Sequence, residues 1–146
     1  MKELAGSLSS VVRNAERRLL EFSDADAART AGPGVWTKKE LLGHLIDSAS
    51  NNHQRFVRMQ LADNLKLFKY AQEDWVKVQH YQSTDWASLI ELWRVYNLHL
   101  ARVIAQVRPE TLGHTCTLSD SEPVTLQFLM EDYLAHMEHH LKDLLK

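Results

Sequence analysis

The 146-residue sequence contains one cysteine, three prolines and five glycines, and each scarcity excludes a class of protein. A single cysteine cannot form an internal disulfide bond, so the fold is not a small scaffold held together by disulfides. With few prolines and glycines, long helices can run uninterrupted, and a hydrophobic share of 45% is enough for a core of ordinary size. We therefore expect one mostly helical domain over residues 1–146.

Two further absences concern partners and location. Acidic residues outnumber basic ones by 19 to 17, so the chain lacks the positive field that nonspecific nucleic-acid binding requires. No run approaches the 18 apolar residues of a membrane span, and residues 1–10 lack the apolar segment of a signal peptide. We expect a cytoplasmic protein that acts on a small-molecule substrate, with no nucleic-acid and no membrane partner.

Four stretches have the apolar spacing of amphipathic helices. We predict them at about residues 2–22, from residue 38 to an irregular stretch that begins at residue 63, at about 85–107 and at 125–146. Thr37 and Glu40 form a capping box that starts the second helix at Lys38, and Thr125 can cap the last one. The expected fold class is all-α, a four-helix up-and-down bundle with crossover connections.

The two long connections give less definite signals. Residues 63–85 spread Tyr70, Trp75 and Tyr81 through a polar background, with one short helix expected at Glu73 to Gln79. These aromatic residues either form the wall of a pocket or simply cover the end of the bundle. In the second connection, the two threonines beside Cys116 favour a loop or a short extended segment, and no electropositive surroundings indicate a nucleophilic thiol.

Histidines are the residues with the clearest chemical potential. On the last helix, His136 and His140 lie side by side along one flank of the apolar stripe, whereas His139 points away. The stripe itself consists of Leu126, Met130, Tyr133, Leu134, Met137, Leu141 and Leu144. Two imidazoles at positions i and i+4 can chelate one cation, but histidines that edge a core and bond to neighbouring helices give the same pattern.

A third histidine, His44, lies off the apolar stripe of the second helix. It shares a polar line with Ser48, Asn51 and Arg55, separate from apolar residues such as Leu45. This position disfavours a histidine in the apolar core. Two alternatives remain: His44 is exposed to solvent, or it faces a polar cavity between helices.

The runs at residues 36–49, 51–56 and 136–140, together with residues 70–75 and 93–98, resemble the DinB/YfiT-like superfamily of metalloenzymes. The resemblance extends over nearly the whole chain from Ala31 onward. It implies a four-helix bundle, often a homodimer, with a divalent metal bound by His44, His136 and His140. Known activities in the superfamily depend on thiols: bacillithiol S-transfer and mycothiol-dependent maleylpyruvate isomerisation. A low-molecular-weight thiol is therefore an expected co-substrate.

Three neutral imidazoles can bind zinc or nickel and leave one coordination position open, as catalytic sites do. A thiol in that position would give an S-transferase, which we place first, and a water would give a hydrolase. We predict Asn51, Arg55 and Asn97 as cofactor-binding residues of the pocket, with Arg55 suited to a carboxylate. The sequence assigns no catalytic acid or base. The remaining alternative is a helical bundle that serves binding or dimerisation without catalysis.

Overall fold

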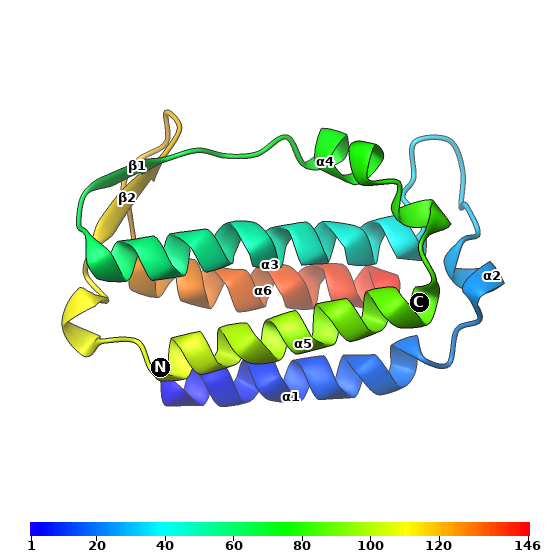
Figure 1. Ribbon diagram of the computed structural model, residues 1–146, viewed down its shortest axis with the longest axis horizontal. Coiled ribbons are helices and arrows are strands. Elements are labelled where there is room, and N and C mark those ends of the chain that lie inside the picture. Colours follow the sequence, from blue (N-terminus) through cyan, green and yellow to red (C-terminus); the bar gives the residue numbers. More distant parts are fainter.

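The computed structural model describes residues 1–146, and four long helices make up most of it (Figure 1). The long helices are α1 (Lys2–Leu19), α3 (Lys38–Leu61), α5 (Trp86–Ala105) and α6 (Leu126–Leu144). The shorter elements are α2 (Asp24–Ala27), β1 (Leu65–Leu67), α4 (Gln72–Gln79), η1 (Tyr81–Ser83), η2 (Pro109–Thr111), β2 (Thr115–Leu118) and β3 (Val124–Thr125). The predicted four-helix bundle is confirmed. No helix is both long enough and apolar enough to span a membrane.

Side-chain caps mark the starts of α3 and α6. The Thr37 hydroxyl accepts from the Glu40 amide at 3.2 Å, and the Glu40 carboxylate accepts from the Thr37 amide at 2.8 Å. This confirms the predicted capping box, which satisfies two amides that a helix start leaves without partners. Thr125 likewise caps α6 by accepting from the Phe128 amide at 3.1 Å. These local bonds place the predicted starts of α3 and α6 correctly.

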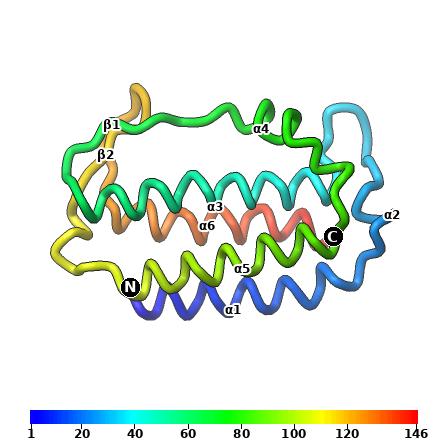
Figure 2. Tube along the Cα trace, in the orientation of Figure 1, coloured from blue at the N-terminus to red at the C-terminus, as the bar shows by residue number.

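The direction of the helices differs from a simple up-and-down order. α3 and α5 run the same way, and α1 and α6 run the opposite way (Figures 1 and 2). Because α3 and α5 are parallel neighbours, residues 62–85 must return along the full length of the bundle before α5 can begin. This crossover carries β1, α4 and η1 past one side of α3. It forms one side of the region around the histidines.

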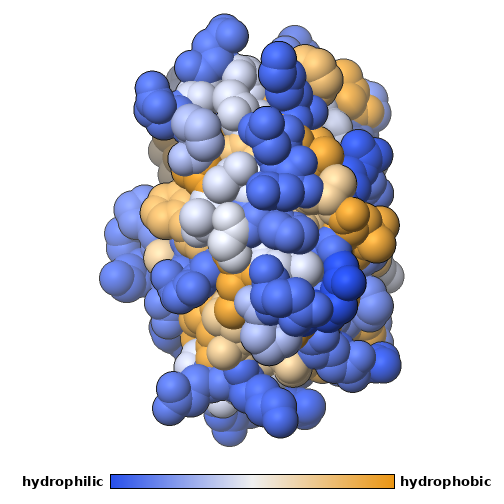
Figure 3. Space-filling view, turned by 90° about the vertical axis from the view of Figure 1, so that its left-hand side faces the viewer, coloured by the Kyte–Doolittle hydropathy of each residue, from blue (hydrophilic) through white to orange (hydrophobic).

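A three-stranded sheet corrects the strictly all-α prediction. Its order is β1-β2-β3, with β1 parallel to β2, and β2 antiparallel to β3. The strands are two to four residues long, so they show no alternation that sequence reading could detect. Cys116 lies buried in β2 opposite Leu65, which confirms its predicted extended setting. Figure 3 looks onto this end of the molecule, where hydrophilic side chains surround separate apolar areas.

The core lies between the four long helices. Every residue of the predicted apolar stripe of α6 is buried, so that prediction is confirmed. Trp93 of α5 and Phe56 of α3 are among the largest side chains that are fully buried. The aromatic residues of the crossover have different settings. Tyr81 is buried against α3, whereas Trp75 is 38% exposed and its ring lies tilted against that of Tyr70, with the centroids 5.0 Å apart.

Candidate metal centre

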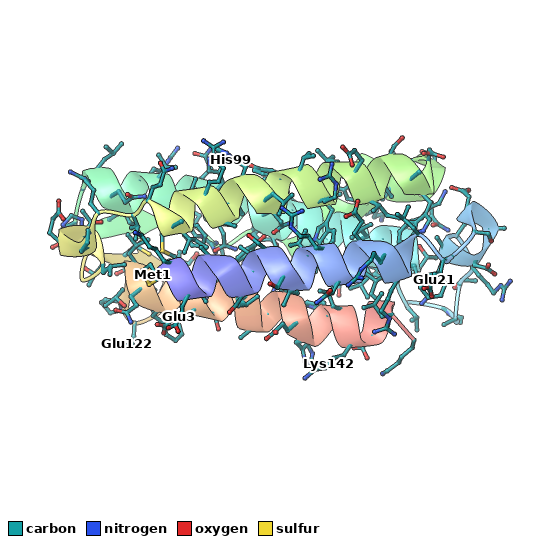
Figure 4. All side chains as sticks on the ribbon, turned by 90° about the horizontal axis from the view of Figure 1, so that it is seen from below. Met1, Glu3, Glu21, His99, Glu122 and Lys142 are labelled. Atoms are coloured by element: carbon teal, nitrogen blue, oxygen red, sulfur yellow. The ribbon has the colours of Figure 1, made fainter.

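The last helix presents two of its three histidines inward. His136 and His140 are half-buried, and their Nε2 atoms lie 3.1 Å apart. His139 is exposed, as its different angle on the helix predicts. Figure 4 shows Lys142, one turn further along, on the outer side of α6 and pointing away from the bundle. The i, i+4 spacing therefore brings together His136 and His140 and leaves His139 outside.

His44 lies opposite this pair, on α3. Its side chain is fully buried, which settles the two alternatives in favour of an enclosed position between helices. The ring centroid is 5.4 Å from that of His136 and 4.9 Å from that of His140. Trp36, just before the capping box, lies against the same ring with a centroid distance of 5.1 Å. The start of α3 thus determines the positions of both His44 and Trp36.

The three imidazoles form one cluster of potential ligand atoms. One ring nitrogen from each of His44, His136 and His140 lies within 4.8 Å of the other two. Neither nitrogen of His44 has a hydrogen-bond partner, although both are buried. Buried polar atoms are almost always paired in folded proteins, so such an orphan requires an explanation. An ion held by the three rings would supply the missing partner for one of the two atoms.

Burial also keeps the three rings neutral. It lowers the pKa of His44 to about 4, helped by the neighbouring His140 and His136, because a charged ring would be poorly solvated there. Burial lowers the pKa of His136 and of His140 as well. Metal ions bind the neutral form of imidazole. The cluster is therefore in its metal-binding protonation state at neutral pH without any cost of proton removal.

An open cavity of ≈ 1070 Å³ reaches the cluster from solvent at His140. Trp36 and Asp143 line it beside the cluster, and Glu73 and Lys77 of α4 line it from the crossover. The crossover therefore borders the entrance through Glu73 and Lys77, whereas Tyr70, Trp75 and Tyr81 do not line this cavity.

The structure places the three predicted pocket residues in different settings. Asn51 lies on α3, where its amide donates to the Asp47 carbonyl at 2.9 Å. Arg55 is half-buried and donates to the Phe68 carbonyl at 3.2 Å, with no carboxylate in ion-pair contact. Asn97 is fully buried on α5. Its amide donates to the Trp93 carbonyl at 2.8 Å, and its oxygen accepts from the Tyr133 hydroxyl.

Sequence reasoning did not single out Asp47. This residue follows His44 by one helical turn and is only 2% exposed. Its Oδ1 accepts from Gln79 Nε2 and from the Tyr81 hydroxyl, both at 2.7 Å. Burial raises the pKa of this carboxyl despite both hydrogen bonds. The available signal is the acidic side chain itself, one turn from His44 on a helix with a polar line.

Comparison with protein families identifies the chain. The model of the DinB superfamily matches residues 7–144, which is nearly the entire sequence. The chain belongs to the DinB superfamily. The resemblance that the sequence motifs indicated is thereby confirmed. A search of curated proteins found no match to this DinB-superfamily chain.

Solved structures of similar fold include three relevant neighbours of this DinB-superfamily protein. YfiT from Bacillus subtilis, described as a probable metal-dependent hydrolase with an unusual four-helix bundle topology, has a TM-score of 0.81 and 18% identity over 99% of this chain and 87% of its own. A mycothiol-dependent maleylpyruvate isomerase has a TM-score of 0.78 and 14% identity, over 99% of this chain but only 60% of its own. A DinB-like protein from Bacillus subtilis has a TM-score of 0.69 and 14% identity, over 97% of this chain and 86% of its own. At these identities the likeness shows the shared fold.

Proposed function

We propose that this protein is a metal-dependent enzyme in which His44, His136 and His140 bind one divalent cation, zinc or nickel. The observation that carries the proposal is the buried ring of His44, which faces two other imidazoles with both its nitrogen atoms unpartnered. Leaving a buried polar atom unsatisfied costs about 1–3 kcal/mol. A cation shared by the three rings removes this cost for the nitrogen that binds it.

The spacing of the nitrogen atoms supports such an ion. Two nitrogen ligands at 2.0–2.1 Å from a tetrahedral zinc ion are about 3.3 Å from each other. The Nε2 atoms of His136 and His140 are 3.1 Å apart, close to this value, and a ring nitrogen of His44 lies within 4.8 Å of both ligand atoms. Three protein ligands leave one coordination position open, as in catalytic rather than structural sites.

The reaction we propose first is transfer of a thiol sulfur to an electrophilic small molecule. A bound cation would lower the pKa of the thiol or water that fills its open position. The three histidines hold that position between α3 and α6, and Trp36 shields His44 from water on one side. Arg55 has no carboxylate partner of its own, so it can bind a carboxylate of the thiol co-substrate.

Hydrolysis is the second candidate, because the same open position can hold water. The description of YfiT as a probable metal-dependent hydrolase supports it, and the mycothiol dependence of the isomerase supports a thiol. The two reactions are separated by supplying a chlorinated aromatic electrophile with a panel of low-molecular-weight thiols, and ester and amide substrates in parallel. Metal-dependent hydrolysis without any thiol adduct would replace the transferase proposal.

Elemental analysis of protein purified without a histidine tag tests the metal site. We expect one equivalent of zinc or nickel in the wild type and in His139→Ala, and loss of metal in His136→Ala. His44→Ala should weaken metal binding and reduce turnover about 10²-fold, because the remaining pair no longer fixes where the open position points. A metal-free wild type, or loss of metal in His139→Ala alone, would contradict the assignment and favour a non-catalytic bundle.

A further inference from the structure

Asp47 has a buried carboxylate that has no role in the site proposed above. It lies three residues after His44, on the side of α3 that faces the crossover. No lysine, arginine or histidine forms an ion pair with it. Carboxylates are rarely buried without a positive partner, because removing the charge from water is costly. A functional reason for this carboxylate is therefore worth seeking.

The two carboxylate oxygens have opposite environments. Oδ1 receives both hydrogen bonds from the crossover, from Gln79 and Tyr81, each at 2.7 Å. The Tyr81 ring itself lies against Gly43, where a Cβ atom would overlap it. Oδ2 is buried and has no partner at all. The carboxylate is thus held in one orientation by its first oxygen, while its second oxygen remains available.

Attachment of the crossover explains only half of this arrangement. One neutral oxygen suffices to accept from Gln79 and Tyr81, and the amide oxygen of an asparagine would serve without burying a charge. The additional cost of an ionisable group with an unpaired oxygen is not explained by that attachment. A hydrogen-bond donor that arrives only with bound metal and substrate would explain it.

We propose that Asp47 is a positioning residue of the centre, whose Oδ2 accepts a hydrogen bond from the thiol or water in the open position beside His44. The inference rests on the proposed function. Residues three apart on a helix are neighbours on its surface, so Asp47 lies beside His44 on α3. Asp47 is not among the three residues whose ligand atoms cluster, which agrees with an outer rather than a direct role.

The test measures zinc affinity by competition with a chromophoric chelator. We expect Asp47→Asn to bind zinc about 10–100-fold more weakly, as is typical for loss of an outer partner. Tyr81→Phe removes one bond to Oδ1 but leaves Oδ2 in place, so its affinity should fall much less. Asp132→Asn removes the same charge from an exposed carboxylate one turn before His136, and controls for long-range attraction of the cation.

Thermal unfolding of the metal-free proteins checks that a loss of zinc affinity does not come from a damaged fold. Because burial raises the pKa of Asp47, the charged form opposes folding at neutral pH, and Asp47→Asn should be at least as stable as the wild type. An attachment role alone predicts normal zinc affinity in Asp47→Asn, because an asparagine oxygen also accepts from Gln79 and Tyr81, and that result overturns the inference. Equal losses of affinity in Asp47→Asn and Asp132→Asn overturn it too. If the wild type binds zinc and Asp47→Asn binds it equally well, only this inference fails; a wild type without zinc affinity removes the proposed function as well.

Discussion

Acidification should destabilise the metal-free protein, and His44 should account for most of the effect. The pKa of this ring is 6.5 in an unfolded chain and about 4 in the folded protein. A histidine with a lowered pKa contributes stability that is complete above pH 6.5 and is lost as the pH falls to about 4. The difference corresponds to about 3 kcal/mol, of which about 2 kcal/mol is lost by pH 5. The lowered pKa values of His136 and His140 act in the same direction.

Urea unfolding followed by circular dichroism at pH 8, 7, 6 and 5, with a chelator present, measures this loss. Such a loss is a large part of the 5–15 kcal/mol that typically stabilises a domain. His44→Gln cannot take up the proton, so its free energy of unfolding should depend less steeply on pH. His139→Gln, at an exposed position, should behave like the wild type. The reasoning would be refuted by a wild type that is equally stable at pH 8 and 5. It would also be refuted if the free energy of unfolding of His44→Gln depended on pH as steeply as that of the wild type.

Two further predictions concern packing around the centre. Gly43→Ala should lower the free energy of unfolding by about 2 kcal/mol, because its methyl group would overlap the Tyr81 ring. Gly6→Ala, in an exposed helix position with open space around it, should instead gain about 0.5–1 kcal/mol, and urea titrations of both proteins check the contrast. Tyr133→Phe should cost about 1–3 kcal/mol by leaving the buried Asn97 oxygen without its donor. Its zinc affinity, measured with the same chelator, should stay that of the wild type; a drop would connect Asn97 to the metal pocket.

Features with local causes could be read from the sequence. The Thr37 capping box spans four residues, and the stripe of α6 follows from helical periodicity alone, so both were predicted correctly. The sheet was missed because its strands are very short and pair Leu65 with Cys116, about fifty positions away. The parallel direction of α3 and α5 was missed for a related reason. Helical periodicity shows which face is apolar but not the direction in which the next helix runs.

In the site, too, features with local causes could be predicted and contacts between distant residues could not. The angle between His136, His140 and His139 is a property of one helix, and the structure places all three as expected. His44 remained ambiguous, because a helical wheel gives its angle to the apolar stripe and not the identity of the neighbouring helix. The contact between Asp47 and Tyr81 spans 34 positions and depends on how the crossover returns. Such contacts have no periodic signal, and only the folded chain shows them.

The sheet has a consequence for how the three histidines are held together. β1 follows α3 and β3 precedes α6, so the β1-β2-β3 sheet joins the ends of the two ligand-bearing helices that lie far from the histidines. The stretch of α3 from His44 to Leu61 is about 26 Å long. This remote covalent and hydrogen-bonded link keeps His44 opposite the His136–His140 pair without any ion between them. We therefore expect the three imidazoles to form a standing site, so that binding and loss of an ion would not require unfolding.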